Sequence, residues 1–239
     1  MSNRVDLSRI KALSFDLDDT LWAIMPIIHQ AEKASRDWLL DHYPDTASFF
    51  ATQSVLSLRE AVLADYPDRH HDLSFLRKEC IGRVLEDAGY TREGVDGAFE
   101  AFCYARNTIE LFDDVVPFFD EFASRYVFLA LTNGNASVAR TPLKDTFDTY
   151  LNAIKVGAAK PEPIMFETAL AAHTLAPDEM LHIGDDLYSD VQGAAQLAIP
   201  TVWVNRFGRP WLAESDVRPD FVINSLTQLG HILAATEQR

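Results

Sequence analysis

Cysteines are scarce in this sequence, and long apolar runs are missing. The 239 residues include two cysteines, Cys80 and Cys103, both in stretches with helical spacing and neither near a second metal ligand at zinc-finger spacing. We therefore expect two reduced thiols in a cytoplasmic protein and no disulfide framework. No apolar run approaches the ~20 residues of a membrane-spanning helix, and residues 1–11 lack the apolar core of a secretory signal.

Basic residues are also in the minority, with 21 Lys and Arg against 36 Asp and Glu and a formal net charge of -15. This balance argues against nucleic acid or an anionic membrane as a partner, because both favour a basic surface. A small anionic substrate remains compatible if a metal ion, a lysine or helix N-termini supply local positive charge. The hydrophobic content of 48% fits a globular chain with a sizeable core.

The first 106 residues combine one short apolar strand with a long helical region. Residues 12–16 form an apolar run that ends in Asp16, which predicts a buried strand. From residue 23 to residue 106 apolar residues recur at helical spacing in four groups, with turn signals between them. This pattern predicts an inserted, all-helical domain of about four helices.

The second half alternates between strand and helix patterns. Strands are predicted at 126–132, 152–156, 180–184, 200–204 and 219–223, the last at an edge, and helices at 162–173, 187–197 and 226–235. Such alternation is typical of an α/β fold with a doubly wound, mainly parallel, Rossmann-like sheet. In such sheets ligands bind beyond the carboxyl ends of the strands.

Four polar segments follow predicted strands. They are Asp16-Leu17-Asp18-Asp19-Thr20, Leu131-Thr132-Asn133-Gly134-Asn135, Gly157-Ala158-Ala159-Lys160-Pro161 and Gly184-Asp185-Asp186-Leu187-Tyr188-Ser189-Asp190. Each alone also reads as a solvated turn, a helix cap or a surface Lys-Pro pair. Together they bring acids, a hydroxyl and a lysine to one edge of one sheet, which favours a functional site.

This ordered set of motifs resembles the haloacid dehalogenase superfamily of phosphohydrolases with a helical cap. The resemblance implies a catalytic core at residues 1–22 and 107–239 and a cap at 23–106 that closes over the site. It implies that Asp16 is the nucleophile of an aspartyl-phosphate intermediate and that Asp18 is the acid and base. It also implies a Mg²⁺ ion held by the Asp16 side chain, the Asp18 backbone carbonyl and the Asp185 side chain, with Asp190 holding metal-bound water.

The remaining motif residues fit the needs of phosphoryl transfer, which depends on charge neutralisation and positioning. By the same resemblance, Lys160 neutralises both the nucleophile and the transferred phosphoryl group. The Thr132 hydroxyl and the backbone N–H groups around Leu17, Asp18 and Asn133 are expected to bind phosphate oxygens. The acid at position 18 favours phosphate-ester hydrolysis, since the dehalogenases and phosphonate-cleaving relatives of this fold lack one there.

A narrower resemblance concerns the substrate. Residues 14–22, 131–135 and 182–187 are similar to bacterial helical-cap phosphatases that act on flavin mononucleotide (FMN) and on 5-amino-6-(5-phosphoribitylamino)uracil, a precursor in riboflavin biosynthesis. We expect a small phosphorylated metabolite as substrate and a monomer or small homo-oligomer. Trp22 is expected either to stack on a planar substrate or to make a core contact. Asp19 and Thr20 are expected to fix the loop by local hydrogen bonds.

Three alternatives stay open at this point. A phosphomutase of the same fold would return the phosphoryl group to the substrate, and nothing in the sequence excludes it. A non-catalytic phosphate-binding module would be expected to lack Asp16, Asp18 or Lys160, and all three are present. A dehalogenase would not need the acid at Asp18.

Overall fold

A computed structural model describes residues 5–210 and 218–235 of the chain. These residues form two compact units. The first, here called the sheet unit, comprises the described parts of Met1–Ala23, Glu110–Gly134 and Pro142–Arg239, and the second, the helical unit, comprises Ile24–Ile109 and Asn135–Thr141. Within the described ranges, no helix has both the length and the apolar character needed to cross a bilayer.

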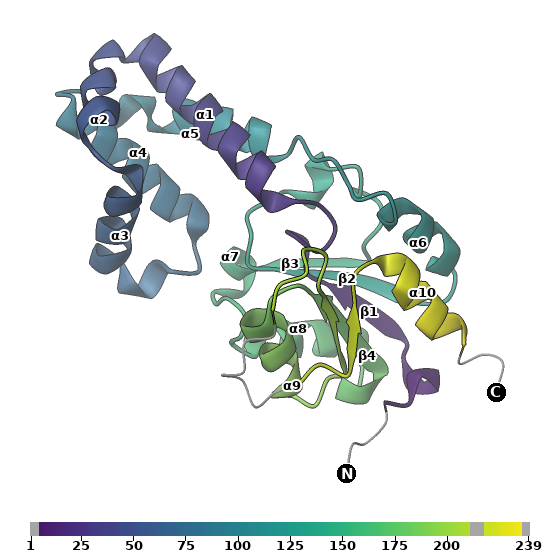
Figure 1. The fold of residues 1–239 in the computed structure, drawn as a ribbon. Helices are drawn as coiled ribbons and strands as arrows, with labels where there is room; N and C mark the ends of the chain where they lie inside the picture. The colour runs from purple at the N-terminus through teal and green to yellow at the C-terminus, as the bar shows by residue number, and fades with distance from the viewer. Residues whose placement is uncertain (1–4, 211–217, 236–239) are drawn as a thin grey trace. The chain divides into compact units, whose positions relative to one another are not determined.

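The sheet unit is built on a six-stranded sheet whose described strand pairs are all parallel, in the order β3-β2-β1-β4-β5-β6 (Figure 1). The strands are β1 (Ala12–Phe15), β2 (Val127–Thr132), β3 (Thr149–Asn152), β4 (Met180–Gly184), β5 (Thr201–Val204) and β6 (Phe221–Ile223). The predicted doubly wound, mainly parallel sheet is therefore confirmed. The strand order reverses at β1, so the carboxyl ends of β1, β2 and β4 lie side by side at a topological switch point.

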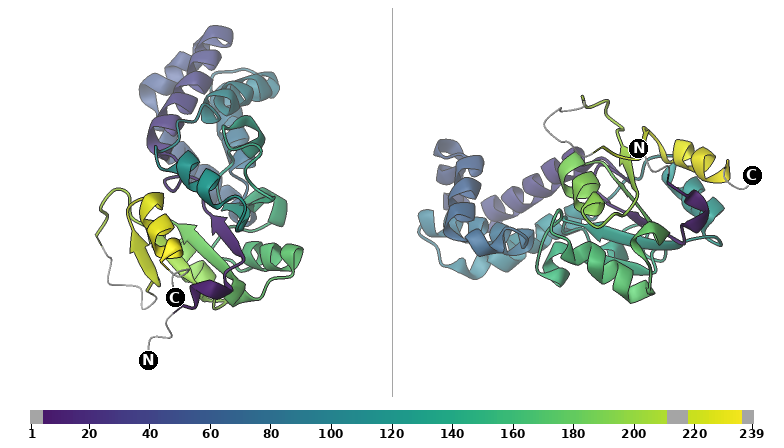
Figure 2. Two further views of the ribbon diagram at one scale, coloured as in Figure 1. Left: turned by 90° about the vertical axis from the view of Figure 1, so that its right-hand side faces the viewer. Right: turned by 90° about the horizontal axis from the view of Figure 1, so that it is seen from below.

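Helices cover both faces of this sheet (Figures 1 and 2). The helices of the sheet unit are α6 (Val115–Phe122), α7 (Ala153–Val156), α8 (Ile164–His173), α9 (Gly193–Ala195) and α10 (Leu226–Ala234). Successive side chains of β1 point to opposite faces. Phe15 contacts Phe118 and Phe119 of α6, whereas Ala12 belongs to an apolar cluster with Phe166 of α8. All four residues of β1 are buried and three of them are apolar, because neither face of the strand meets water.

The helical unit contains five α-helices, all within described residues. They are α1 (Ile24–His42), α2 (Ala47–Thr52), α3 (Val55–Asp65), α4 (Leu73–Asp87) and α5 (Val95–Arg106). The four predicted helical groups correspond to α1, α3, α4 and α5, while α2, which is only six residues long, was not predicted. A cluster of buried side chains, including Leu39, Phe49 and Leu85, forms the core of this unit. Cys80 and Cys103 are free thiols, as expected.

Short 3-10 helices connect these elements at Leu7–Arg9, Pro44–Thr46, Pro67–Arg69, Arg92–Gly94, Val138–Arg140 and Pro177–Glu179, and Leu187–Gln192 forms a π-helical turn (η7). The strand predicted at 152–156 is wrong. Strand β3 ends at Asn152, whose side chain accepts a hydrogen bond from the Lys155 N–H at 2.9 Å and so caps helix α7. Gly157, at a φ of 78°, ends that helix in the left-handed conformation that favours glycine.

Candidate active site

The polar segments that follow β1, β2 and β4 meet at one edge of the sheet. Asp16 follows β1, Thr132 ends β2, and Asp185 follows β4. The Asp16 N–H donates to the Ile183 carbonyl at 2.8 Å, which ties the ends of β1 and β4 together. A pocket of about 300 Å³ opens there and is lined by Asp16, Asp18, Asp19, Thr132, Asn133, Gly134, Lys160, Asp185, Asp186, Ser189, Asp190 and Arg209.

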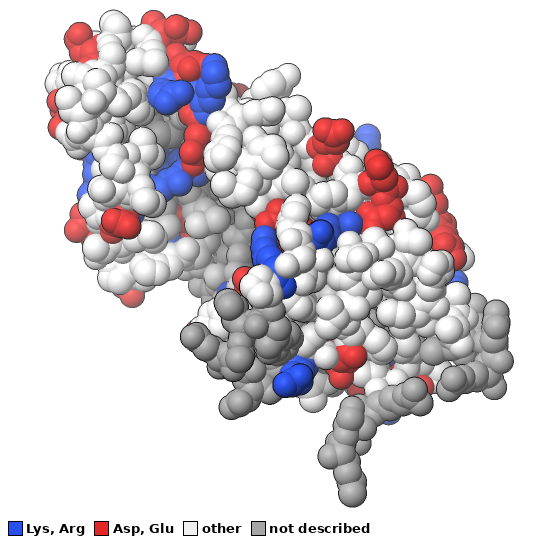
Figure 3. Space-filling model, in the orientation of Figure 1, with Lys and Arg blue, Asp and Glu red and all other residues white. Residues whose placement is uncertain are grey.

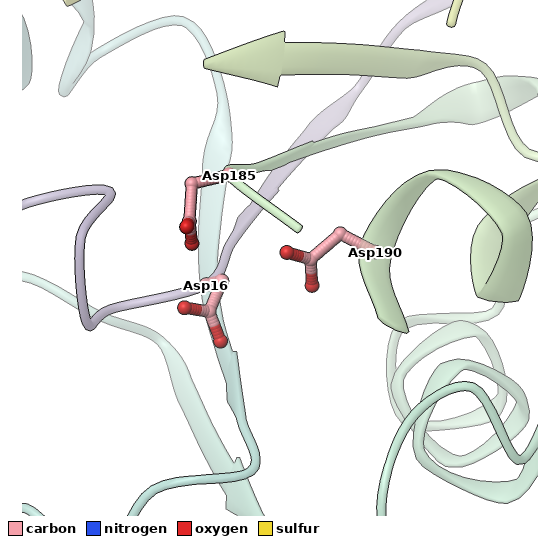
Figure 4. Close-up of side chains that lie close together, drawn as sticks. All are labelled: Asp16, Asp185 and Asp190. Atoms are coloured by element: carbon pink, nitrogen blue, oxygen red, sulfur yellow. The ribbon is translucent and has the colours of Figure 1, made fainter. Parts of the chain in front are cut away.

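Three carboxylates in this pocket point toward one another (Figure 4). One oxygen from each of Asp16, Asp185 and Asp190 lies within 4.8 Å of the others. Gly184 permits this arrangement, because a Cβ at that position would lie 2.3 Å from Cγ of Asp190. An all-oxygen donor set of this kind suits Mg²⁺, a hard cation, so the residues fit the metal that the sequence predicts.

Lys160 is the buried cation of the site. Its Nζ donates hydrogen bonds to Asp16 Oδ1 at 2.8 Å, Asp190 Oδ1 at 2.6 Å and the Leu131 carbonyl at 2.6 Å, which uses all three of its protons. The Lys160 backbone is fixed as well. The Asn133 side chain accepts from its N–H at 2.7 Å and donates to its carbonyl at 2.8 Å. The sequence assigned Asn133 a backbone role only, so this side-chain bridge was not predicted.

Burial and charge act against each other on the pKa values of these groups. Burial alone would lower the pKa of Lys160, but the attraction of Asp16 and Asp190 outweighs it and raises that pKa. Burial and the neighbouring carboxylates raise the pKa of Asp16 well above its usual range. Burial also raises the pKa of Asp185 to about 7, with the charge of Asp190 adding to the effect. One lysine therefore does not neutralise three carboxylates.

The pKa of Asp190 is lowered, whereas those of Asp16 and Asp185 are raised. Burial would raise its pKa, but Lys160 and a hydrogen bond from His182 lower it overall. Burial in turn lowers the pKa of His182, so its ring is neutral at physiological pH. Its Nε2 lies 3.2 Å from Asp190 Oδ1 and its Nδ1 lies 2.9 Å from the Ser14 Oγ. The single ring proton therefore sits on Nε2, and Nδ1 accepts the Ser14 hydroxyl proton.

The loop after β1 holds Asp18 at the pocket. The Trp22 indole Nε1 donates to Asp18 Oδ1 at 2.8 Å, and Trp22 is fully buried. This burial agrees with the core-contact alternative for Trp22 and excludes the substrate-stacking alternative. Asp19 adopts a φ of 58°, and its backbone N–H donates to the Trp22 carbonyl at 2.8 Å. The loop thus closes on itself between residues 16 and 22.

Arg209 lies at the rim of the pocket and pairs with two of its acids. Its guanidinium donates to Asp185 Oδ2 at 2.8 Å and to Asp19 Oδ2 at 2.9 Å. The Asp185 backbone carbonyl accepts a hydrogen bond from the Trp203 indole at 2.8 Å. Asp19 therefore fixes the loop in two ways, through its local backbone hydrogen bond to Trp22, as expected, and through a side-chain ion pair with a residue 190 positions away.

Three further residues named from the sequence are Thr132, Leu17 and Asp186, and each has a defined local environment. The Thr132 hydroxyl accepts a hydrogen bond from the Gly134 N–H at 2.9 Å and lines the pocket. The Leu17 side chain is fully buried. Asp186 caps the η7 turn by accepting from the N–H groups of Tyr188 and Ser189 at 3.0 and 2.6 Å. Asp186 thus acts as a helix cap in this structure.

Three residues at the site were missed by sequence reasoning. His182 is a lone polar residue inside the apolar β4 run, a position that usually signals a satisfied core histidine. Trp203 reads as an ordinary core residue of β5. Arg209 follows the carboxyl end of β5 in the segment Asn205-Arg-Phe-Gly-Arg209, so its place at the ligand-binding edge was the one signal available.

Several known proteins are similar to this chain in sequence. A family model described as haloacid dehalogenase-like hydrolase matches residues 10–197. The 5-amino-6-(5-phospho-D-ribitylamino)uracil phosphatase YigB of Escherichia coli is 32% identical over 202 residues, which cover 83% of this chain and 84% of that protein. The glyceraldehyde 3-phosphate phosphatase of Pyrococcus furiosus is 29% identical over 241 residues, covering 95% and 94%.

A solved structure is also similar. The crystal structure titled 2-haloacid dehalogenase, from Pseudomonas syringae pv. Tomato DC3000, superposes with a TM-score of 0.86 at 35% identity. The match covers 95% of this chain and 99% of that chain. The described residues therefore share both their fold and a third of their sequence with that protein.

Proposed function

Because this chain belongs to the haloacid dehalogenase-like hydrolase family and its curated relatives are phosphatases, we propose that it is a Mg²⁺-dependent phosphomonoesterase that works through an aspartyl-phosphate on Asp16. The observation that carries the proposal is the meeting of Asp16, Asp185 and Asp190 around Lys160, with Asp18 in the same pocket. The sheet unit would be the catalytic core and the helical unit the cap.

The proposed reaction has two steps, and Asp16 and Asp18 take part in both. A carboxylate oxygen of Asp16 attacks phosphorus while the bond from phosphorus to the ester oxygen breaks. The electron pair goes to the leaving oxygen, and Asp18 gives that oxygen its proton, so an alcohol departs. The ionised Asp18 then takes a proton from water as the water oxygen attacks phosphorus and the bond from phosphorus to the Asp16 oxygen breaks. Inorganic phosphate leaves, and the carboxylate of Asp16 is restored.

The metal would be held by Asp16, the Asp18 backbone carbonyl and Asp185, with Asp190 beside it. Bound there, Mg²⁺ would supply the positive charge that lets an anionic carboxylate approach an anionic phosphate. Lys160 would orient the Asp16 carboxylate through its 2.8 Å hydrogen bond. Thr132 and the backbone N–H groups of Leu17, Asp18 and Asn133 would bind the transferred phosphoryl oxygens.

The substrate we propose is a small phosphorylated metabolite, with FMN and 5-amino-6-(5-phosphoribitylamino)uracil as the first candidates. The identity of 32% with the YigB phosphatase supports this choice. On the face drawn in Figure 3, described Lys and Arg side chains lie among Asp and Glu in each unit and form no continuous basic surface. That distribution supports a metabolite rather than a nucleic acid as the partner.

Two variants test the mechanism with 4-nitrophenyl phosphate as substrate. Asp16→Asn should abolish phosphate release, because an amide is a poor nucleophile, and full activity in this variant would rule out the covalent route. Asp18→Asn should lower kcat by ~10²–10⁴-fold, because no base then activates the water that hydrolyses the aspartyl-phosphate. Its Mg²⁺ affinity should stay intact, since the backbone carbonyl of residue 18 remains. A phosphate-release screen over sugar phosphates, nucleotides and FMN, each with Mg²⁺ and with EDTA, would rank the substrates.

Hydrolytic dehalogenation is a second candidate, because the similar structure from Pseudomonas syringae has 2-haloacid dehalogenase in its title. Asp18 favours the phosphatase, since a halide leaves without needing a proton. Chloride release from 2-chloropropionate, measured beside phosphate release, separates the two. A phosphomutase would instead show transfer of labelled phosphate to a second position of the substrate, with little free phosphate.

A further inference from the structure

A buried hydrogen bond links Trp22 to the proposed acid and base of the reaction. The indole Nε1 of Trp22 lies 2.8 Å from Asp18 Oδ1. An indole nitrogen can only donate, and a buried one normally finds an acceptor. In this protein the acceptor is a carboxylate that lines the catalytic pocket, although core backbone carbonyls could serve a purely structural tryptophan equally well.

The indole is held in place from several sides. The Trp22 side chain is fully buried. Its carbonyl accepts from the Asp19 N–H at 2.8 Å, and its backbone forms bridges with Asp18 and with Leu111. Next to it, the Leu21 carbonyl accepts from the Phe112 N–H at 3.0 Å. The donor position is therefore fixed by the core of the sheet unit and does not depend on solvent-exposed groups.

Because the indole N–H is held in one position, it restricts the carboxyl group of Asp18 that accepts its hydrogen bond. Holding Oδ1 of Asp18 limits rotation about its side-chain bonds, so the carboxyl group keeps one orientation at the pocket. We propose that Trp22 is a positioning residue that holds Asp18 in the orientation needed to protonate the leaving oxygen. The proposal rests on the phosphatase function given above. It concerns proton transfer only, because the Trp22 side chain is fully buried and acts through its hydrogen bond to Asp18.

The dependence of rate on the leaving group is the readout for this role. A nitrophenolate leaves readily without a proton, whereas the alkoxide of glycerol 2-phosphate needs one. Trp22→Phe keeps an aromatic ring and removes the N–H. We expect it to lower kcat/KM for glycerol 2-phosphate by ~10–100-fold and to change that for 4-nitrophenyl phosphate by less than about threefold. A purely structural loss would lower both values by the same factor.

Trp203→Phe is the matched control. Trp203 is also buried, and its indole donates to the backbone carbonyl of Asp185 at the same distance of 2.8 Å. Because that contact involves no proton donor of the reaction, we expect Trp203→Phe to change kcat/KM for both substrates by the same factor. If Trp22→Phe does not give a cooperative thermal transition, benzothienylalanine at position 22 keeps the bicyclic shape and still removes the N–H.

A double-mutant cycle completes the test. With Asp18→Asn already present, adding Trp22→Phe should leave the ratio of the two kcat/KM values unchanged, since the proton donor is already lost. An unchanged ratio in Trp22→Phe alone overturns the positioning role, and the phosphatase proposal stands if Asp18→Asn shifts the ratio. If Asp18→Asn does not shift the ratio, the acid role of Asp18 is wrong and the inference about Trp22 falls with it.

Discussion

Replacing Lys160 by methionine tests the charge arrangement of the site through stability alone. The substitution keeps an unbranched side chain of similar length and removes the cation that contacts Asp16 and Asp190 at 2.8 and 2.6 Å. The Lys160 side chain is 1% exposed, so water cannot take the place of the ammonium group. Removing one partner of a buried ion pair costs ~3–5 kcal/mol.

This loss should appear as a fall in Tm of roughly 6–20 °C, at about 2–4 °C per kcal/mol for a chain of this size. The measurement is thermal unfolding in EDTA at pH 7.5. Lys11→Met is the matched control, because Lys11 pairs with Glu179 at 2.5 Å while its side chain is 63% exposed. An exposed pair of this kind contributes ~0–1 kcal/mol, so its Tm should change little.

The pH dependence of the Lys160→Met effect has a defined sign. Without the ammonium, burial raises the pKa values of Asp16 and Asp190 above those of the unfolded chain. The folded state then binds more protons than the unfolded state, so stability falls as pH rises. The Tm difference from wild type should therefore be smaller at pH 5 than at pH 7.5. Equal losses in the two Lys→Met variants, or a larger loss at pH 5, would refute the reasoning.

Three further predictions concern the metal and its surroundings. The affinity for Mg²⁺, measured by calorimetry, should fall by roughly tenfold per pH unit below about 7, because the metal needs Asp185 ionised and its pKa is raised to about 7. Gly184→Ala should weaken Mg²⁺ binding and lower stability by ~1–3 kcal/mol, since the new Cβ would lie 2.3 Å from Asp190. Arg209→Gln should strengthen Mg²⁺ binding, because the guanidinium now competes for Asp185, while its half-exposed pairs with Asp19 and Asp185 make the change in Tm small.

Much of the fold follows from short-range patterns. Strands β1, β2, β4 and β5 are mainly apolar runs that are almost entirely buried, and such runs can be recognised in the sequence without a structure. The error at residues 152–156 has a local cause, because Ala153–Val156 has a strand-like composition but is capped by Asn152. Helix α2 is too short to show a period. Helix α6 was not predicted, and its third residue is Pro117, a residue that is typical of a helix boundary.

The site also contains residues that the sequence could place and contacts that it could not. Asp16 and Asp185 could be placed at one edge because each directly follows a strand in a parallel sheet. Lys160 was placed there through the strand predicted at 152–156, which is wrong, and in the structure it follows helix α7. Their partners could not be placed, because contacts such as those from His182 and Trp203 depend on the register of β4 against β1 and β5. Register fixes which side chain faces which neighbour, and composition does not reveal it.

The charges that line the pocket also predict the order in which Mg²⁺ and phosphate bind. Among the described residues of the lining, six aspartates face two cations, Lys160 and Arg209. Both cations are already paired with carboxylates, through Asp16 and Asp190 for the lysine and Asp185 and Asp19 for the arginine. A phosphate dianion entering this pocket alone would meet net repulsion. We therefore expect a divalent cation to bind first. By linkage, phosphate should then tighten Mg²⁺ binding by the same factor as Mg²⁺ tightens phosphate binding.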